Sequence, residues 1–207
     1  MNFPRKKLLL TALLGVTWIA AVAFGLGVLL RYESTPGHIG VVDGNWPATS
    51  AIPRPGPKPM LVMLAHPHCP CTRASIGELA QIMADTQGKL DACVLFTKPK
   101  GTGADWDDTE LRRSAAAIPG VTVLTDSDGS EALLFGAETS GHTLLFDRAG
   151  ALLFSGGITA SRGHAGGNTG ESAIIAAVNG KRSDRARTPV FGCALVTAST
   201  QGAICSK

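Results

Sequence analysis

The chain has 207 residues, 44% of them hydrophobic, and a formal net charge of +3. Arg5, Lys6 and Lys7 account for all of that charge, so the rest of the chain is balanced and its charge gives no support to a nucleic-acid partner. With an apolar N-terminal segment and a linker set aside, the remainder has the size of one domain with a core of its own.

The N-terminal basic residues are followed by an uncharged apolar stretch from Leu8 to Leu30. At about 1.5 Å per residue, this stretch is long enough to cross a hydrocarbon core of about 30 Å. We therefore expect residues 1–30 to form a single anchor in the inner membrane, with everything after Arg31 on the periplasmic side. A cleaved signal peptide is the alternative, because Ala21-Val22-Ala23 has the form of a cleavage site.

The next segment, residues 31–59, is rich in proline and glycine. It holds six of the twelve prolines in the chain. Such a composition disfavours both helix and sheet, so we expect an extended linker that lies outside the core.

From Met60 onward the hydrophobic pattern alternates between strands and helices. It predicts strands at 60–65, 91–97, 121–124, 142–147 and 151–154, the last two forming a hairpin. It predicts helices at 71–86, 107–117, 131–135 and 169–178. The acidic cluster Asp105-Trp106-Asp107-Asp108 is interpreted as a helix start, and Asp126-Ser127-Asp128-Gly129 as a turn. The predicted domain covers 60–180, and a tail follows at 181–207.

The motif His66-Pro67-His68-Cys69-Pro70-Cys71-Thr72-Arg73 lies between the first predicted strand and the first predicted helix of this domain. The amides at a helix N-terminus stabilise an anion, so a cysteine placed there forms the reactive thiolate more readily than an ordinary one. Cys69 and Cys71 are therefore the candidate catalytic residues, with Cys69 as nucleophile and Cys71 as its partner.

The order of elements, with cysteines after an early strand, resembles the thioredoxin-like fold, an α/β fold with a central mixed sheet flanked by helices. The segment GHTLLFDRAGALLFSG is similar to one in the thioredoxin-like proteins of cytochrome c maturation. HPHCPCTRAS and FSGGITASRGH resemble anchored redoxin-type proteins labelled RedB-like. The resemblance implies a thiol-disulfide oxidoreductase that acts through a mixed disulfide, with periplasmic protein thiols and disulfides as partners and no organic cofactor.

The chain departs from that family pattern in two places. Most thioredoxin-like enzymes have two residues between the cysteines, whereas here only Pro70 separates them, so Thr72 or His68 stands where the family has its other cysteine. Gly141 occupies the position of the family's cis-proline. The accessory candidates beside the two thiols are His68, Thr72, Arg73, Gly141 and His142.

The remaining cysteines leave two pairings open. Five cysteines cannot all pair within one chain, and Cys93 is expected to be a buried packing residue in its strand. Cys193 and Cys205 in the tail either form a structural disulfide with each other, or Cys193 resolves a disulfide with Cys69 or Cys71.

Two other classes of function stay open beside the oxidoreductase. His66, His68, Cys69 and Cys71 offer nitrogen and sulfur ligands for copper(I) or zinc, which is the basis of a copper-delivery hypothesis. The third hypothesis is a non-catalytic assembly protein whose cysteines are structural. We rank the oxidoreductase first.

Overall fold

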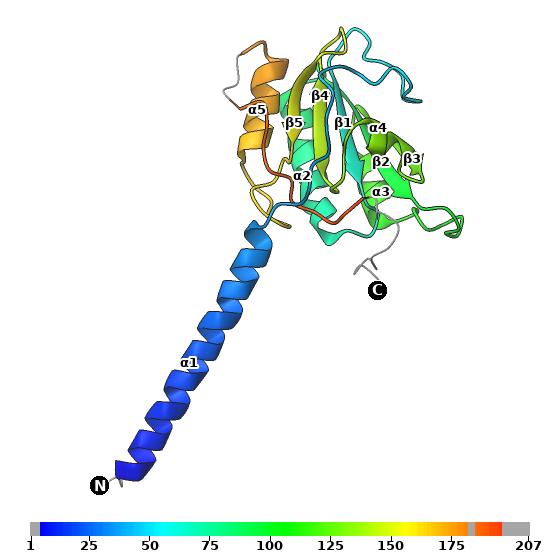
Figure 1. Ribbon diagram of the computed structural model, residues 1–207. Coiled ribbons are helices and arrows are strands. Elements are labelled where there is room, and N and C mark those ends of the chain that lie inside the picture. The colour runs from blue at the N-terminus through cyan, green and yellow to red at the C-terminus, as the bar shows by residue number, and fades with distance from the viewer. Residues whose placement is uncertain (1–4, 182–184, 196–207) are drawn as a thin grey trace. The chain divides into compact units, whose positions relative to one another are not determined.

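The computed structural model describes residues 5–181 and 185–195, and it divides the chain after Thr35 into two units (Figure 1). The N-terminal unit contains the helix α1, Arg5–Ser34, in which no side chain is buried. In the described part of the chain, α1 is the one helix whose length and composition would let it cross a membrane. The structure thus confirms a long apolar helix, a property that membrane anchors and signal sequences share.

The second unit is built on one five-stranded mixed sheet with the strand order β3-β2-β1-β4-β5 (Figure 1). Its strands are β1 (Met60–Ala65), β2 (Asp91–Lys98), β3 (Val121–Ser127), β4 (His142–Phe146) and β5 (Leu152–Gly156). The first three strands are parallel to one another, whereas β4 is antiparallel to β1 and β5 is antiparallel to β4. All five predicted strands are present.

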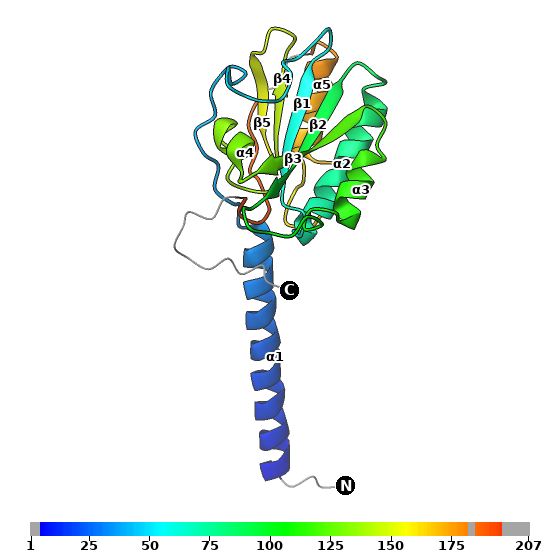
Figure 2. The ribbon, with the colours of Figure 1, turned by 90° about the vertical axis from the view of Figure 1, so that its right-hand side faces the viewer.

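Four helices accompany the sheet. They are α2 (Pro70–Asp85), α3 (Glu110–Ala116), α4 (Ser130–Leu134) and α5 (Thr169–Val178). Figure 2 shows α2 and α3 on one side of the sheet and α4 on the other. All four predicted helices are present, although α3 begins later than expected.

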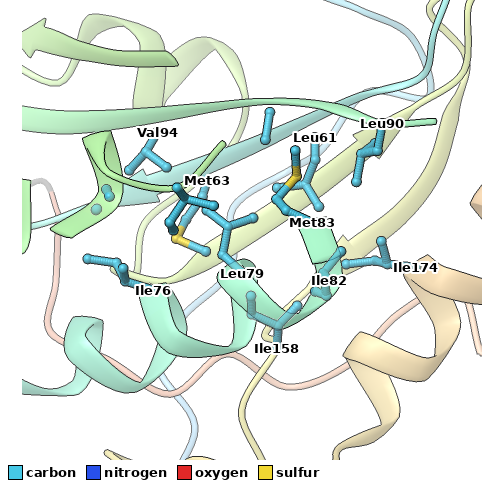
Figure 3. Packing of buried hydrophobic residues seen from close by; sticks show 14 of the residues in the cluster. Leu61, Met63, Ile76, Leu79, Ile82, Met83, Leu90, Val94, Ile158 and Ile174 are labelled. Carbon is cyan, nitrogen blue, oxygen red and sulfur yellow. The ribbon is translucent and has the colours of Figure 1, made fainter. Parts of the chain in front are cut away.

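The alternation of side chains along β1 creates a core on each face of the sheet. Leu61 and Met63 pack with α2, α3 and α5. Figure 3 shows the apolar side chains of α2 directed at β1. Val62 and Leu64 point the other way, into a second cluster that includes Phe135. Because α2 is held along its whole apolar face, its N-terminal residue has a fixed position.

The expectation that residues 31–59 lie outside the core is wrong for part of this segment. Trp46 and Ile52 are both buried in the second cluster, and the Trp46 ring makes edge contacts with Phe135 and Phe146. The backbone N–H of Trp46 also donates to the Gly150 carbonyl over 2.7 Å. Large apolar side chains can thus recruit a proline-rich segment to a core.

The predicted start of α3 was also wrong. Asp105 to Asp108 are not helical, and Thr109 is the N-cap, accepting a hydrogen bond from the N–H of Arg112. The Asp107 carboxylate is buried and binds Lys98 at 2.8 Å, Arg112 at 3.0 Å and the Thr125 hydroxyl at 2.7 Å. Ion pairs with Lys98 of β2 and Arg112 of α3 and the hydroxyl of Thr125 on β3, rather than the helix dipole, determine the position of this acid.

The turn predicted at 126–129 begins later than expected. Asp126 and Ser127 still pair with β2, which lengthens β3 beyond the predicted Leu124. The Asp126 carboxylate accepts hydrogen bonds from the N–H groups of Glu131 and Ala132. It therefore supports the start of α4 while remaining in the strand.

Candidate thiol site

Cys69 is the N-cap residue of α2. Its backbone is extended, with φ −83° and ψ 118°, and Pro70 begins the helix with the fixed φ that suits this position. The Cys69 N–H donates to the His66 carbonyl over 3.1 Å, which closes the turn between β1 and α2. Cys69 is 0% exposed and Cys71 is 8% exposed, so both thiols lie below the surface at the positively polarised end of the helix.

A segment of the C-terminal tail runs alongside this turn. The Ser140 N–H donates to the Cys193 carbonyl over 2.8 Å, and the Leu195 N–H donates to the Glu138 carbonyl over 2.9 Å. Gly192 fits there because a Cβ would overlap the Ser140 carbonyl group. These contacts bring Cys193 to Cys69, so the structure brings together three of the sequence-predicted thiols: Cys69, Cys71 and Cys193.

Hydrogen bonds to sulfur give the thiols opposite acidities. The side chain of Cys193, the thiol of Cys71, the Cys193 N–H and the Thr72 hydroxyl all bond to Cys69, and together they outweigh burial and hold the pKa of Cys69 far below its usual value. The same bond to Cys69, together with burial and the Cys69 charge, raises the pKa of Cys71 well above its usual value. These interactions favour the thiolate form of Cys69 and the protonated form of Cys71.

Arg162 is a site residue that sequence reasoning missed. It lies in the glycine-rich loop between β5 and α5, which carries no recognisable motif. Its guanidinium donates to the Gly192 carbonyl over 2.6 Å, and its charge opposes the raised pKa of the neighbouring Cys71. Arg162 thus links the motif to the tail. The sequence did not single out Arg162, because the glycines around it are typical of a flexible loop.

Ser140 is a second missed residue, one position before the predicted Gly141. Its hydroxyl accepts a hydrogen bond from the His66 N–H at 2.8 Å and lies 2.7 Å from the Thr72 hydroxyl. Gly141 has φ +87° and donates its N–H to the Leu64 carbonyl, so glycine suits this turn into β4. The structure therefore places Thr72, Ser140 and Gly141 around the motif, and the described residues contain no cis peptide bond.

The two histidines of the motif flank Trp106. The ring centroid of Trp106 is 5.5 Å from that of His66 and 4.7 Å from that of His68. The Nδ1 atom of His66 accepts the His68 N–H, and Nε2 of His68 bonds the Trp106 carbonyl. Burial lowers the pKa of His66 against the opposing Cys69 charge. Among the described residues, no three His, Cys, Asp or Glu side chains are grouped so that they could hold a metal ion.

Two accessory candidates, Arg73 and His142, bond to residues other than the thiols. The exposed Arg73 makes two 2.9 Å bonds to the Glu110 carboxylate, which joins α2 to α3. His142 is fully buried on β4, where its Nε2 bonds the Ser155 hydroxyl of β5 at 2.9 Å. By strand alternation, His142 shares a sheet face with Leu144 in the second cluster, whereas α2 covers the opposite face.

An open groove of about 280 Å³ leads to the site from the surface between α2 and α3. Its lining residues are Pro67, His68, Cys69, Pro70, Arg73, Thr109, Glu110 and Leu111. Cys93 lies away from it as a buried thiol of β2, where burial and the Glu131 charge raise its pKa to about 12. Cys205, the other residue of the structural pairing predicted for the tail, lies outside the described residues.

No family model matches this sequence, and no curated protein matches it. Solved structures do match. An uncharacterised conserved protein from Geobacillus kaustophilus has a TM-score of 0.59 and 17% identity, over 82% of this chain and 92% of that chain. A hypothetical protein from Sinorhizobium meliloti has a TM-score of 0.55 and 20% identity, over 81% and 99% of the two chains. A secreted disulfide oxidoreductase from Mycobacterium tuberculosis has a TM-score of 0.45 and 16% identity, over 59% and 83%.

The second unit has a thioredoxin-like fold. The fold predicted from the sequence is therefore confirmed. In this thioredoxin-like domain, β1 leads directly into the cysteine motif, and Gly141 enters β4 beside the end of β1. The C-terminal segment with Cys193 lies beyond the last helix of the fold and adds a third thiol to the site.

Proposed function

We propose that the chain is a membrane-anchored, extracytoplasmic thiol-disulfide oxidoreductase with Cys69 as its nucleophile and Cys71 as the partner within the motif. The placement of Cys69 carries this conclusion. Cys69 lies at a helix N-terminus and lines an open groove, and the neighbouring Cys193, Cys71 and Thr72 lower its pKa. Such an arrangement is typical of a cysteine that reacts as a thiolate.

The chemistry follows from these acidities. The Cys69 thiolate attacks one sulfur of a substrate disulfide, the substrate S–S bond breaks, and the second substrate sulfur leaves as a thiolate that takes up a proton. Cys69 then has no charge, so the two effects of Cys69 that raise the Cys71 pKa disappear and only burial still raises it. A second thiol of the chain can now lose its proton and attack the Cys69 sulfur, which releases the reduced substrate and leaves a disulfide in the chain.

The N-terminal unit supports the proposed location. Arg5, Lys6 and Lys7 precede the apolar part of α1, and basic flanks stay on the cytoplasmic side of a membrane. A single uncleaved span would then place the thioredoxin-like domain in the oxidising compartment where disulfides persist. Protein thiols and disulfides of the periplasm are the partners that fit this location.

The proposal is tested by turnover of a protein disulfide, such as that of insulin, with the full-length chain in detergent and a small dithiol as reductant. We expect catalysed reduction, its loss to the uncatalysed rate in Cys69→Ser, and retention in the matched control Cys93→Ala, whose thiol lies in the core. A folded wild-type chain that gives no turnover would contradict the oxidoreductase. Stoichiometric copper(I) binding by that inactive chain would then favour metal delivery.

A further inference from the structure

The C-terminal segment is built into the thiol site from more than one side. Its backbone pairs with residues 138–140, Gly192 allows close contact with Ser140, and Arg162 binds the Gly192 carbonyl. Cys193 accepts the N–H of Ser140, whose hydroxyl contacts the His66 N–H and the Thr72 hydroxyl of the motif, and Cys193 lowers the pKa of Cys69. The segment therefore presents a thiol directly to the nucleophilic sulfur.

We propose that Cys193, rather than Cys71, resolves the mixed disulfide on Cys69, so that the oxidised form of the chain contains a Cys69–Cys193 disulfide. This inference rests on the proposed oxidoreductase function. It assigns the cysteine of the tail a direct part in the reaction. It also makes Cys71 a hydrogen-bond donor that stabilises the thiolate before attack.

The geometry of the motif favours this assignment. Only Pro70, whose ring fixes φ, separates Cys69, the extended N-cap residue, from Cys71 in the first turn of α2. A bond between these two sulfurs would close a small ring and distort the first turn of α2, which is held by the core beneath it. Cys193 arrives on a separate segment, so a bond to Cys69 closes no small ring.

The resolving step balances in atoms and electrons. After the substrate forms a mixed disulfide with Cys69, the Cys193 thiol loses a proton and its sulfur attacks the Cys69 sulfur. The bond between Cys69 and the substrate breaks, and the substrate sulfur leaves with the electron pair and takes up the proton. The substrate has then gained two electrons, and the chain has lost two as the Cys69–Cys193 disulfide.

Peptide mapping tests this directly on the full-length chain in detergent. The reduced chain is mixed with one equivalent of glutathione disulfide, quenched in acid, alkylated and cut with trypsin. Cleavage after Arg73 and Arg187 separates Cys69 from Cys193, whereas Cys71 stays on the same peptide as Cys69. The variant Cys205→Ser is run in parallel because Cys205 shares a tryptic peptide with Cys193.

We expect a cross-linked pair of peptides in the wild type, in Cys205→Ser and in Cys71→Ser. In Cys193→Ser, we expect the glutathione adduct of Cys69 to accumulate and its resolution to slow at least about tenfold, because the positioned attacking thiol is gone. Circular dichroism checks that each variant is folded. If Cys193→Ser does not fold, the peptide maps of the wild type and of Cys205→Ser still distinguish a Cys69–Cys193 disulfide from a Cys69–Cys71 disulfide.

A Cys69–Cys71 disulfide in one peptide, a cross-link that disappears in Cys205→Ser, or wild-type resolution in Cys193→Ser would overturn the assignment of Cys193. Each of these results would leave Cys69 as a nucleophile and the oxidoreductase intact. If Cys69 forms no mixed disulfide at all, both the inference and the proposed function fail.

Discussion

At the scale of single residues, the unusual feature is a fully buried cysteine with a lowered pKa. Burial alone would keep Cys69 protonated, so its hydrogen bonds must outweigh the loss of hydration. Two of the donors come from Cys193, on a segment that follows the fold's last helix. The acidity of the nucleophile thus depends on the tail as well as on the helix N-terminus.

The ultraviolet absorbance of thiolate tests this acidity. Because the pKa of Cys69 is lowered, we expect one thiolate that persists at a pH at which an ordinary cysteine, with a pKa of about 8.5, is protonated. Cys69→Ser should lose this absorbance, and Cys193→Ala should shift its titration to higher pH. Cys93→Ala should change nothing at neutral pH, because the Cys93 pKa is raised to about 12. Absorbance that appears only in alkali would contradict the hydrogen-bond account.

His142 predicts a loss of stability in acid. Burial lowers its pKa to about 4 in the folded chain, against about 6.5 when unfolded, so the unfolded state binds more protons between these values. The stabilising effect is fully present above pH 6.5 and is lost as the pH falls towards 4. By pH 4 the free energy of unfolding should drop about 3 kcal/mol more in the wild type than in His142→Gln, measured by denaturant titration. Equal losses in the two proteins would refute this linkage.

The cysteine motif could be predicted from sequence because its position depends on neighbours along the chain. An apolar run, a Cys-Pro start and a periodic apolar face define a strand, a turn and a helix locally. Arg162 and Ser140 could not be predicted, because each reaches the motif through contacts between distant segments. The proximity of Cys193 to Cys69 was only one of two alternatives for the same reason.

At the scale of elements, the loop between β2 and α3 depends on one buried carboxylate. The hydrogen bonds of Asp107 to Lys98 and Thr125 and the Lys98 charge lower its pKa, although burial, the largest effect, opposes them. This anchoring holds the loop that carries Trp106 against His66 and His68. The sequence interpretation missed it because an acid near a helix start has an obvious local explanation.

Replacing Asp107 by Asn should therefore destabilise the fold, because it leaves Lys98 and Arg112 without their shared partner. We expect a loss of about 2 to 4 kcal/mol in the free energy of unfolding, measured by denaturant titration with Trp fluorescence. Asp108→Asn is the matched control, since Asp108 pairs with Arg113 on the exposed surface and should change stability by less than about 1 kcal/mol. Similar losses in both variants would show that the buried ion pairs of Asp107 contribute no more to stability than the exposed ion pair of Asp108.

At the scale of the whole molecule, the proline-rich segment after α1 belongs in part to the thioredoxin-like domain. Composition predicted a linker over 31–59, and composition cannot show that single large side chains such as Trp46 and Ile52 fill a core. The five strands and four helices could be predicted, because each follows from periodicity repeated over several residues, and the sheet flanked by helices was implied by the resemblance to the thioredoxin-like fold. Single buried residues such as Trp46 and Ile52 produce no repeated hydrophobic pattern in the sequence.

Truncating Trp46 tests the membership of this segment in the domain. Trp46→Ala removes a buried ring in contact with Phe135 and Phe146, so we expect a loss of about 3 to 5 kcal/mol in the free energy of unfolding. Val41→Ala, at a side chain that is 91% exposed, should change it by less than about 0.5 kcal/mol. If Trp46→Ala were as stable as the wild type, the segment would be a linker after all.

The redox equilibrium of Cys69 tests the central claim most directly. The full-length chain in detergent is equilibrated across a series of glutathione ratios, quenched in acid, denatured and alkylated, and the state of Cys69 is read by mass spectrometry. An oxidoreductase predicts a reversible transition of Cys69 into an intramolecular disulfide, with the two-electron dependence of about 30 mV per tenfold change. A Cys69 that stays fully alkylated at every ratio would contradict it.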